Sequence, residues 1–161
     1  MGINLYINGV QYGPYSAEDV RELLMTNRAT VDDLCSSTEE PRPEAIQSRL
    51  EWFVGERYRS EPINLLGLNP YYQTEFIKIY ISHEKYKGGW NGYAFLFGGL
   101  WALTKGLWLN LVVVLVCLTI ISILTCGIGG LVLAAIVAVM YACRGNYMYY
   151  CAYVKRRQIA F

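Results

Sequence analysis

The 161-residue sequence has no acidic residue after Glu84, one histidine and no cysteines in Cys-x-x-Cys spacing. The lone histidine and the five scattered cysteines predict neither a metal site nor a disulfide framework, and we expect no cofactor. No basic run precedes an apolar core at the start, and Gly2 lacks the Ser or Thr that myristoylation requires. From the lack of these signals we expect the N-terminal half to stay in the cytoplasm.

Charge is divided unevenly along the chain. Up to Glu84 there are seven Lys and Arg against thirteen acids, which gives −6, and the seven basic residues that follow give +7. From Gly106 to Cys143, 38 residues contain no Asp, Glu, Lys, Arg or His. This stretch is about twice the ~20 residues that a membrane-spanning helix needs. It therefore predicts two slightly short spans.

The predicted spans are residues 106–124 and 128–143, joined by an uncharged turn. Basic residues flank both outer ends, so the positive-inside rule puts both termini in the cytoplasm and the turn outside. We expect five of these side chains to contact lipid headgroups: Lys105, Arg144, Lys155, Arg156 and Arg157. With its four tyrosines, the segment 144–161 is expected to be a basic and aromatic tail on the inner leaflet.

Two further segments precede the spans. Residues 71–89 alternate apolar and charged side chains, which predicts an amphipathic helix next to the membrane. Residues 90–104 are uncharged and aromatic but too short to cross, so this piece is expected to lie at the interface or to enter the bilayer and return.

The N-terminal region has a mixed α+β pattern. Apolar and polar residues alternate from Ile3 to Tyr15 around Asn8-Gly9, which predicts a β-hairpin. Ser16 and Asp19 have the spacing of a capping box and predict a short helix from about Ala17 to Asn27. A further strand is expected near Leu34, and a helical piece at 44–53. The soluble domain is thus predicted at 1–55 and a proline-framed linker at 56–70.

This N-terminal pattern resembles a known family. The elements Leu5-Tyr6-Ile7, Gly13-Pro14-Tyr15-Ser16 and Val31-Asp32-Asp33-Leu34 are similar to the bacterial version of the GYF domain, whose eukaryotic relatives bind proline-rich peptides on an aromatic surface. Cys35 and Ser36 stand where that family has a tryptophan. The resemblance implies a smaller platform for a protein partner, built from Tyr6, Tyr12, Pro14 and Tyr15.

The C-terminal half resembles a bacterial inner-membrane family of unknown function. The resemblance covers about residues 71–158 and rests on Trp90-Asn91, the run from Phe97 to Leu103, and Gly145-Asn146-Tyr147. Gly99 stands where that family has proline. The implied location is the bacterial cytoplasmic membrane, and the family supplies no reaction.

Small residues recur every four positions in this half. They would let helices approach closely in lipid, either inside one hairpin or between copies of the chain. The candidate packing residues are Gly98, Ala102, Gly106, Gly130, Ala134 and Ala138.

The candidates for chemistry are few. His83 sits on a charged helix, and adjacent Asp32 and Asp33 point apart, so solvated or structural roles are favoured for all three. Gly127–Gly130 lacks the lysine of a phosphate-binding loop. Arg144 is expected to extend toward lipid phosphates; the alternatives are a partner helix or a pore lined by Asn110 and Thr119.

The sequence therefore predicts a non-enzymatic adaptor, anchored in the membrane, whose cytoplasmic domain binds a protein partner. The alternative is a homo-oligomeric membrane effector or small pore. A membrane-bound hydrolase that uses His83 or Asp32 is not expected, and neither is nucleic-acid binding, because membrane adhesion already accounts for the basic tail.

Overall fold

A computed structural model describes residues 2–54 and 63–158 of the chain. These form two compact units, Met1–His83 and Glu84–Phe161, which are treated separately below. A small antiparallel sheet and several helices make up the chain, so the α+β class is confirmed. Part of the predicted linker (56–62) and the end of the predicted tail (159–161) lie outside the described residues.

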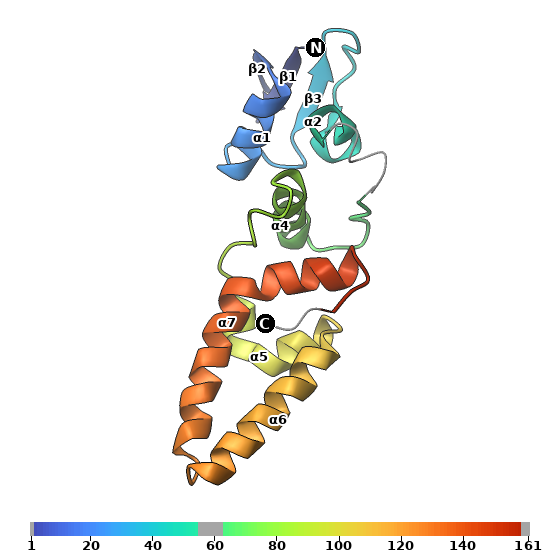
Figure 1. Ribbon diagram of the computed structural model, residues 1–161. Coiled ribbons are helices and arrows are strands. Elements are labelled where there is room, and N and C mark those ends of the chain that lie inside the picture. Colours follow the sequence, from blue (N-terminus) through green and yellow to red (C-terminus); the bar gives the residue numbers. More distant parts are fainter. Residues whose placement is uncertain (1, 55–62, 159–161) are drawn as a thin grey trace. The chain divides into compact units, whose positions relative to one another are not determined.

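The first unit contains the sheet (Figure 1). Its strands are β1 (Ile3–Ile7), β2 (Val10–Tyr15), β3 (Leu34–Ser37) and β4 (Glu44–Ala45), in the order β2-β1-β3-β4. Asn8 and Gly9 join β1 to β2 with φ of 52° and 79°, the left-handed pair that a tight hairpin turn requires. The predicted hairpin is confirmed.

The helix α1 (Ala17–Met25) follows β2 directly. Ser16 caps it, because the Ser16 hydroxyl accepts from the backbone N–H of Asp19 while the Asp19 carboxylate accepts from the backbone N–H of Ser16. Val20 and Leu24 are buried with Ile3 and Leu5 of β1. The capping box and the apolar face expected from the sequence are thus both present.

Among its described residues, the first unit also contains the helical elements η1 (Ile46–Arg49), α2 (Glu51–Val54) and α4 (Pro70–Ile81). Lys78 of α4 donates to the side-chain oxygen of Asn27, just beyond α1. The helix α4 ends earlier than the predicted 71–89, because Ser82 terminates it and His83 and Glu84 have φ of 51° and 62°. Residues with left-handed backbone cannot continue a right-handed helix.

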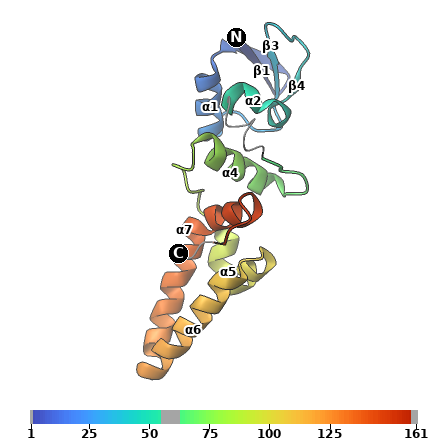
Figure 2. The ribbon, with the colours of Figure 1, turned by 45° about the vertical axis from the view of Figure 1, so that its right-hand side comes forward.

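The second unit consists of α5 (Gly92–Thr104), α6 (Trp108–Leu124) and α7 (Ile128–Tyr153). The helices α6 and α7 diverge from their shared turn, and α5 lies near the open end, where the last turns of α7 change direction (Figures 1 and 2). The sequence predicted that the second helix stops at Cys143. Instead α7 continues for ten residues beyond it, because Arg144 and Asn146 are polar but do not break a helix.

The predicted ridge of small residues on α5 is interrupted. Gly98 has φ of 39° and ψ of −106°, which kinks the helix, and Gly106 lies beyond its end with φ of 71°. Ala102 is buried inside the unit. Gly98, Ala102 and Gly106 therefore do not share one helix face.

By length and composition, α7 is long and apolar enough to cross a membrane. Of an apolar 18-residue stretch of α7, 22% is buried inside the protein. The apolar helices α5 and α6 are shorter, at 13 and 17 residues.

Candidate functional site

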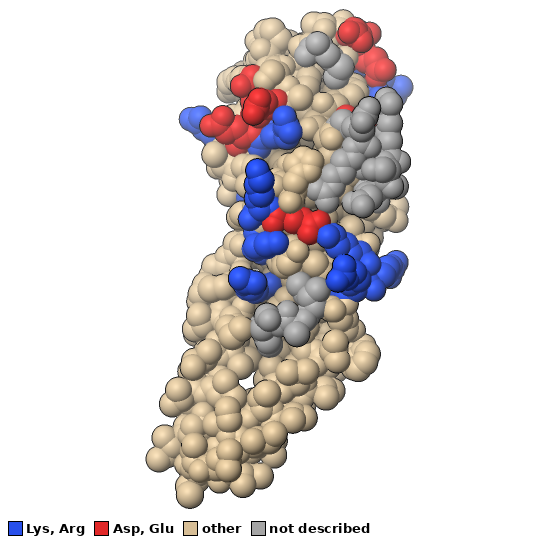
Figure 3. Space-filling model, viewed as in Figure 1, with Lys and Arg blue, Asp and Glu red and all other residues tan. Residues whose placement is uncertain are grey.

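The surface of the second unit is largely apolar. In Figure 3 the region over α6 and the first part of α7 shows no charged side chain, and the charges of this unit gather toward the open end of the helices. Burying so much exposed hydrocarbon requires a partner of matching polarity. The exposed large side chains of α6 and α7 are Trp108, Leu109, Val112, Val113, Leu115, Val116, Ile120, Ile123, Leu124, Ile128, Leu131, Val132, Ile136 and Val139.

A small internal core joins α5 to α7. The Trp101 ring packs edge-on against Tyr141, with ring centroids 6.1 Å apart, and Ala94, Leu107 and Met148 are buried around them. A Cβ atom on Gly145 would lie 2.9 Å from Cη2 of Trp101. Glycine at position 145 is therefore what lets the indole reach the α7 backbone.

Two buried asparagines hold the same helices together. The Asn91 side-chain amide donates to Oδ1 of Asn146 at 2.8 Å, and the Asn146 amide donates to the carbonyl of Gly89 at 3.1 Å. Oδ1 of Asn91 also caps α5 by accepting from the backbone N–H of Ala94. The backbone N–H of Asn91 donates to the Ala142 carbonyl of α7. Because this donor comes from outside the helix, it favours a bend of α7 at Ala142.

Charged and aromatic side chains surround this junction. Lys155 forms an ion pair with Glu84 at 2.6 Å, and the Tyr147 hydroxyl donates to the other carboxylate oxygen of Glu84 at 3.0 Å. The Lys87 ammonium lies 3.8 Å from the centroid of the Tyr147 ring. We call Glu84, Lys87, Tyr147 and Lys155 the polar cluster. Because it is partly buried and internally paired, it fixes the end of α7.

The predicted headgroup residues fall into two groups. Lys155 belongs to the polar cluster, and Lys105 lies 4.9 Å from the Tyr149 ring centroid. Arg144, Arg156 and Arg157 have exposed side chains. No role was predicted for Glu84, Asn91 and Asn146. For the two asparagines, the available signal was their position within otherwise apolar or aromatic runs.

The residues considered for a pore lie in different surroundings. Asn110 is fully buried, the Thr119 hydroxyl donates to the carbonyl of Leu115 in its own helix, and Arg144 is exposed. A hydroxyl bonded to its own helix needs no water.

The residues proposed to bind a partner lie on two faces of the first unit. The strand register pairs Tyr12 with Leu5 and Tyr15 with Ile3, whereas Tyr6 pairs with Gln11 and belongs to the opposite face. Tyr12 and Pro14 are exposed, and Tyr15 is half-buried. Tyr15 lines a groove of about 220 Å³ beside α1, whose other lining residues are Asp19, Glu22, Leu23, Thr26 and Arg28.

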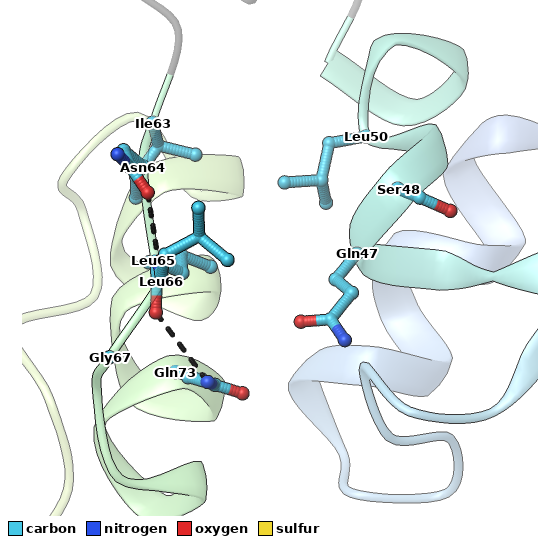
Figure 4. Close-up of a pocket in the computed structure, with 9 residues that line it drawn as sticks. All are labelled: Gln47, Ser48, Leu50, Ile63, Asn64, Leu65, Leu66, Gly67 and Gln73. Atoms are coloured by element: carbon cyan, nitrogen blue, oxygen red, sulfur yellow. Dashed lines mark hydrogen bonds between the residues drawn. The ribbon is translucent and has the colours of Figure 1, made fainter.

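A larger groove of about 440 Å³ lies elsewhere in the first unit, between η1 and the segment that leads into α4 (Figure 4). Leu50 faces Leu65 across it, and the Gln73 amide donates to the carbonyl of Leu65 at 3.5 Å. None of the nine described lining residues is ionisable, so the described part of this groove supplies no general acid or base.

The two carboxylates considered for catalysis both accept hydrogen bonds from other residues of the first unit. Asp33 accepts from the backbone N–H and the hydroxyl of Thr30, and Asp32 accepts from the Gln47 amide at 3.4 Å. His83 is exposed at the end of the first unit. Among residues 2–54 and 63–158, no three His, Cys, Asp or Glu side chains are grouped to hold a metal ion.

Together these features define a small α+β sheet unit joined in one chain to an apolar helical unit that contains a helix able to span a membrane. Residues 48–155 match the model of DUF2628, a family described as proteins of unknown function, so the chain belongs to that family. The match begins in η1 and ends just after α7, and therefore leaves out β1–β4 and α1. No curated protein and no solved structure matches the chain.

Proposed function

We propose that the chain is a non-enzymatic adaptor of the bacterial cytoplasmic membrane, in which the helical unit anchors a protein-binding N-terminal unit. The observation that carries this proposal is the exposed apolar surface of α6 and α7, which contains no Asp, Glu, Lys, Arg or His from Gly106 to Cys143. Lipid chains are apolar and therefore match the polarity of this surface.

The contacts inside the second unit support a hairpin with both ends on one side of the membrane. Asn91 at the start of α5 bonds to Ala142 and Asn146, while Lys105 at its end lies over Tyr149. Both ends of α5 therefore lie beside the second half of α7, so α5 does not cross. All seven basic residues of this unit belong to this end of the hairpin, and the positive-inside rule favours the cytoplasm for it.

The first experiment tests the anchor. Bacterial membranes that contain the full chain are washed with alkaline carbonate, which removes proteins held by charge alone. We expect the chain to stay in the pellet, because its contact with lipid is apolar. Complete release into the supernatant would contradict the anchor.

We further propose that the partner contacts the α1 side of the first unit. Tyr12 and Tyr15 share one face of the sheet in the strand register, and Tyr15, Asp19 and Glu22 line the groove beside α1. Such a surface suits an extended peptide that carries apolar and basic side chains. The resemblance to the GYF domain supports the same kind of partner.

The second experiment tests this face. A photo-crosslinking residue is placed at Glu22 in the full chain, and the protein it captures is purified and its affinity for the chain measured directly. The Tyr12→Ala/Tyr15→Ala variant should lose this binding. Tyr6→Ala is the matched control, because Tyr6 lies on the opposite face, and it should keep it. Equal binding by all three proteins would refute the proposed face.

The homo-oligomeric alternative gains less support. Gly130 and Ala102 are buried inside the unit and are used there. Ala134 remains exposed on α7, so Ala134→Leu is the variant that tests self-association. A discrete oligomer in detergent that this variant dissociates would favour the alternative over the adaptor.

A further inference from the structure

We propose that the α6–α7 hairpin enters the membrane from one face and that its tip, residues Thr125–Gly127, stays in the hydrocarbon without reaching the far headgroups. The partner of the tip is thus lipid chain and not water. This inference rests on the proposed membrane anchor, and it replaces the two crossings that the sequence predicted.

Both arms of the hairpin are short. The helix α6 has 17 residues, which corresponds to about 25 Å at 1.5 Å per residue. The part of α7 before Arg144 begins at Ile128 and is about 24 Å long by the same rise. A bilayer has a hydrocarbon core of about 30 Å. Anchored at its basic end, the hairpin therefore ends before the far boundary.

The hairpin has interfacial side chains at one end only. Segments that cross a bilayer carry Trp and Tyr at both interfaces. In this chain no Trp, Tyr or charged residue occurs from Leu109 to Met140. Every Trp and Tyr of the second unit lies before Leu109 or after Met140, on the side of the basic residues.

The side chains at the tip are suited to lipid. Ile123, Leu124, Ile128 and Leu131 surround the turn and are 73% to 77% exposed. A turn in water would leave these four side chains solvated, whereas hydrocarbon stabilises them. The exposure is continuous with the apolar surface of the two arms.

The polar groups of the turn are largely bonded within the hairpin. The Thr125 hydroxyl donates to the carbonyl of Ile121 at 2.6 Å and accepts from the backbone N–H of Gly129 at 2.8 Å. The backbone N–H of Gly127 donates to the Ser122 carbonyl, also at 2.8 Å. Irregular backbone is tolerated at membrane depth only when its polar groups are satisfied by protein or water.

The two arms also touch at the tip. A Cβ atom on Gly130 would lie 1.9 Å from the Ser122 hydroxyl oxygen, and one on Gly129 would lie 2.6 Å from the Thr125 hydroxyl oxygen. Such close contact excludes water between the arms at this level. The tip is therefore dry inside and apolar outside.

Native cysteines provide the test. Cys117 lies within α6 and Cys126 at the tip, and both are exposed. Full chains with a single nitroxide label at Cys117, at Cys126 or at an Arg156→Cys substitution are reconstituted into vesicles of palmitoyl-oleoyl phosphatidylethanolamine and phosphatidylglycerol. A water-soluble nickel relaxation agent is present on both faces, and its collisions with the label are measured by electron paramagnetic resonance.

We expect the Cys126 label to be protected from collisions with the nickel agent as strongly as the Cys117 label. The label at Arg156→Cys should collide with the agent freely. If Cys126 relaxes like the Arg156→Cys label and Cys117 stays protected, the hairpin crosses; the inference then fails while the anchor stands. If all three labels relax alike, the proposed anchor itself is wrong.

Discussion

Replacing Asn146 with leucine is the sharpest test of how the helical unit is held together. The side chain is fully buried; it accepts a hydrogen bond from Asn91 and donates one to Gly89. Leucine keeps the volume but removes both bonds. Hydrogen bonds between membrane helices contribute about 0.6 to 1.7 kcal/mol each. Asn146→Leu should therefore lower the free energy of unfolding by about 1 to 3 kcal/mol.

The assay is reversible unfolding of the full chain in mixed micelles, followed by tryptophan fluorescence, because Trp101 packs in the adjoining core. Cys143→Ala is the matched control, since Cys143 is exposed on the same helix and should change stability by less than about 0.5 kcal/mol. Asn91→Ser should lose the bond to Asn146 yet keep a side-chain oxygen to cap α5. Equal stability of Asn146→Leu and the control would refute the assigned role of the asparagine pair.

Three further predictions concern packing and protonation. Gly145→Ala should lower the free energy of unfolding by about 1 to 3 kcal/mol, because the new Cβ would lie 2.9 Å from Trp101. Gly92→Ala is the control and should cause no such loss, since the space around Gly92 is open. Thermal unfolding compares the two variants, and equal melting temperatures would contradict the packing of Gly145 on Trp101. The hydrogen bonds from the Ser16 side chain and backbone lower the pKa of Asp19, so the stability they add should be present above the ordinary carboxyl pKa of 3.8 and be lost as pH falls below it. In denaturant titrations the difference in stability between the wild type and Ser16→Ala should therefore narrow in acid; the part that remains comes from the Asp19 N–H bond to the Ser16 hydroxyl, which does not depend on pH. A difference that is the same at every pH would refute this. Burial raises the pKa of the Cys35 thiol from 9.0 to about 11, so the free energy of unfolding should fall as pH rises from about 9 to 11. In a variant with Cys35 as its sole cysteine, the thiol should resist maleimide until the protein unfolds. Rapid labelling of the folded protein would contradict the burial of Cys35.

Local signals explain which parts of the fold could be predicted. Asn8-Gly9 specifies its turn by backbone preference alone, and Ser16 with Asp19 specifies the start of α1 within four residues. The absence of charge from Gly106 to Cys143 likewise locates the apolar helices. Each of these features depends on neighbours in the chain, which is why pattern and spacing were enough.

The parts that the sequence did not predict depend on distant residues. Asn91 and Asn146 are 55 positions apart, and no periodicity links them. Gly98 and Ala102 have the spacing of a packing ridge, but the kink at Gly98 separates them. Likewise, polar Arg144 seemed to mark the end of a helix, although α7 continues because its last turns pack on Trp101 and pair with Glu84.

The asparagine pair also orders events during synthesis. The start of α5 has no side-chain partner at Asn146 until 55 more residues have been made, which takes a ribosome about 3 to 11 s at 5 to 20 residues per second. During that interval the start of α5 cannot form its hydrogen bonds to α7. The packing of α5 on α7 is therefore completed only after the second half of α7 has been translated.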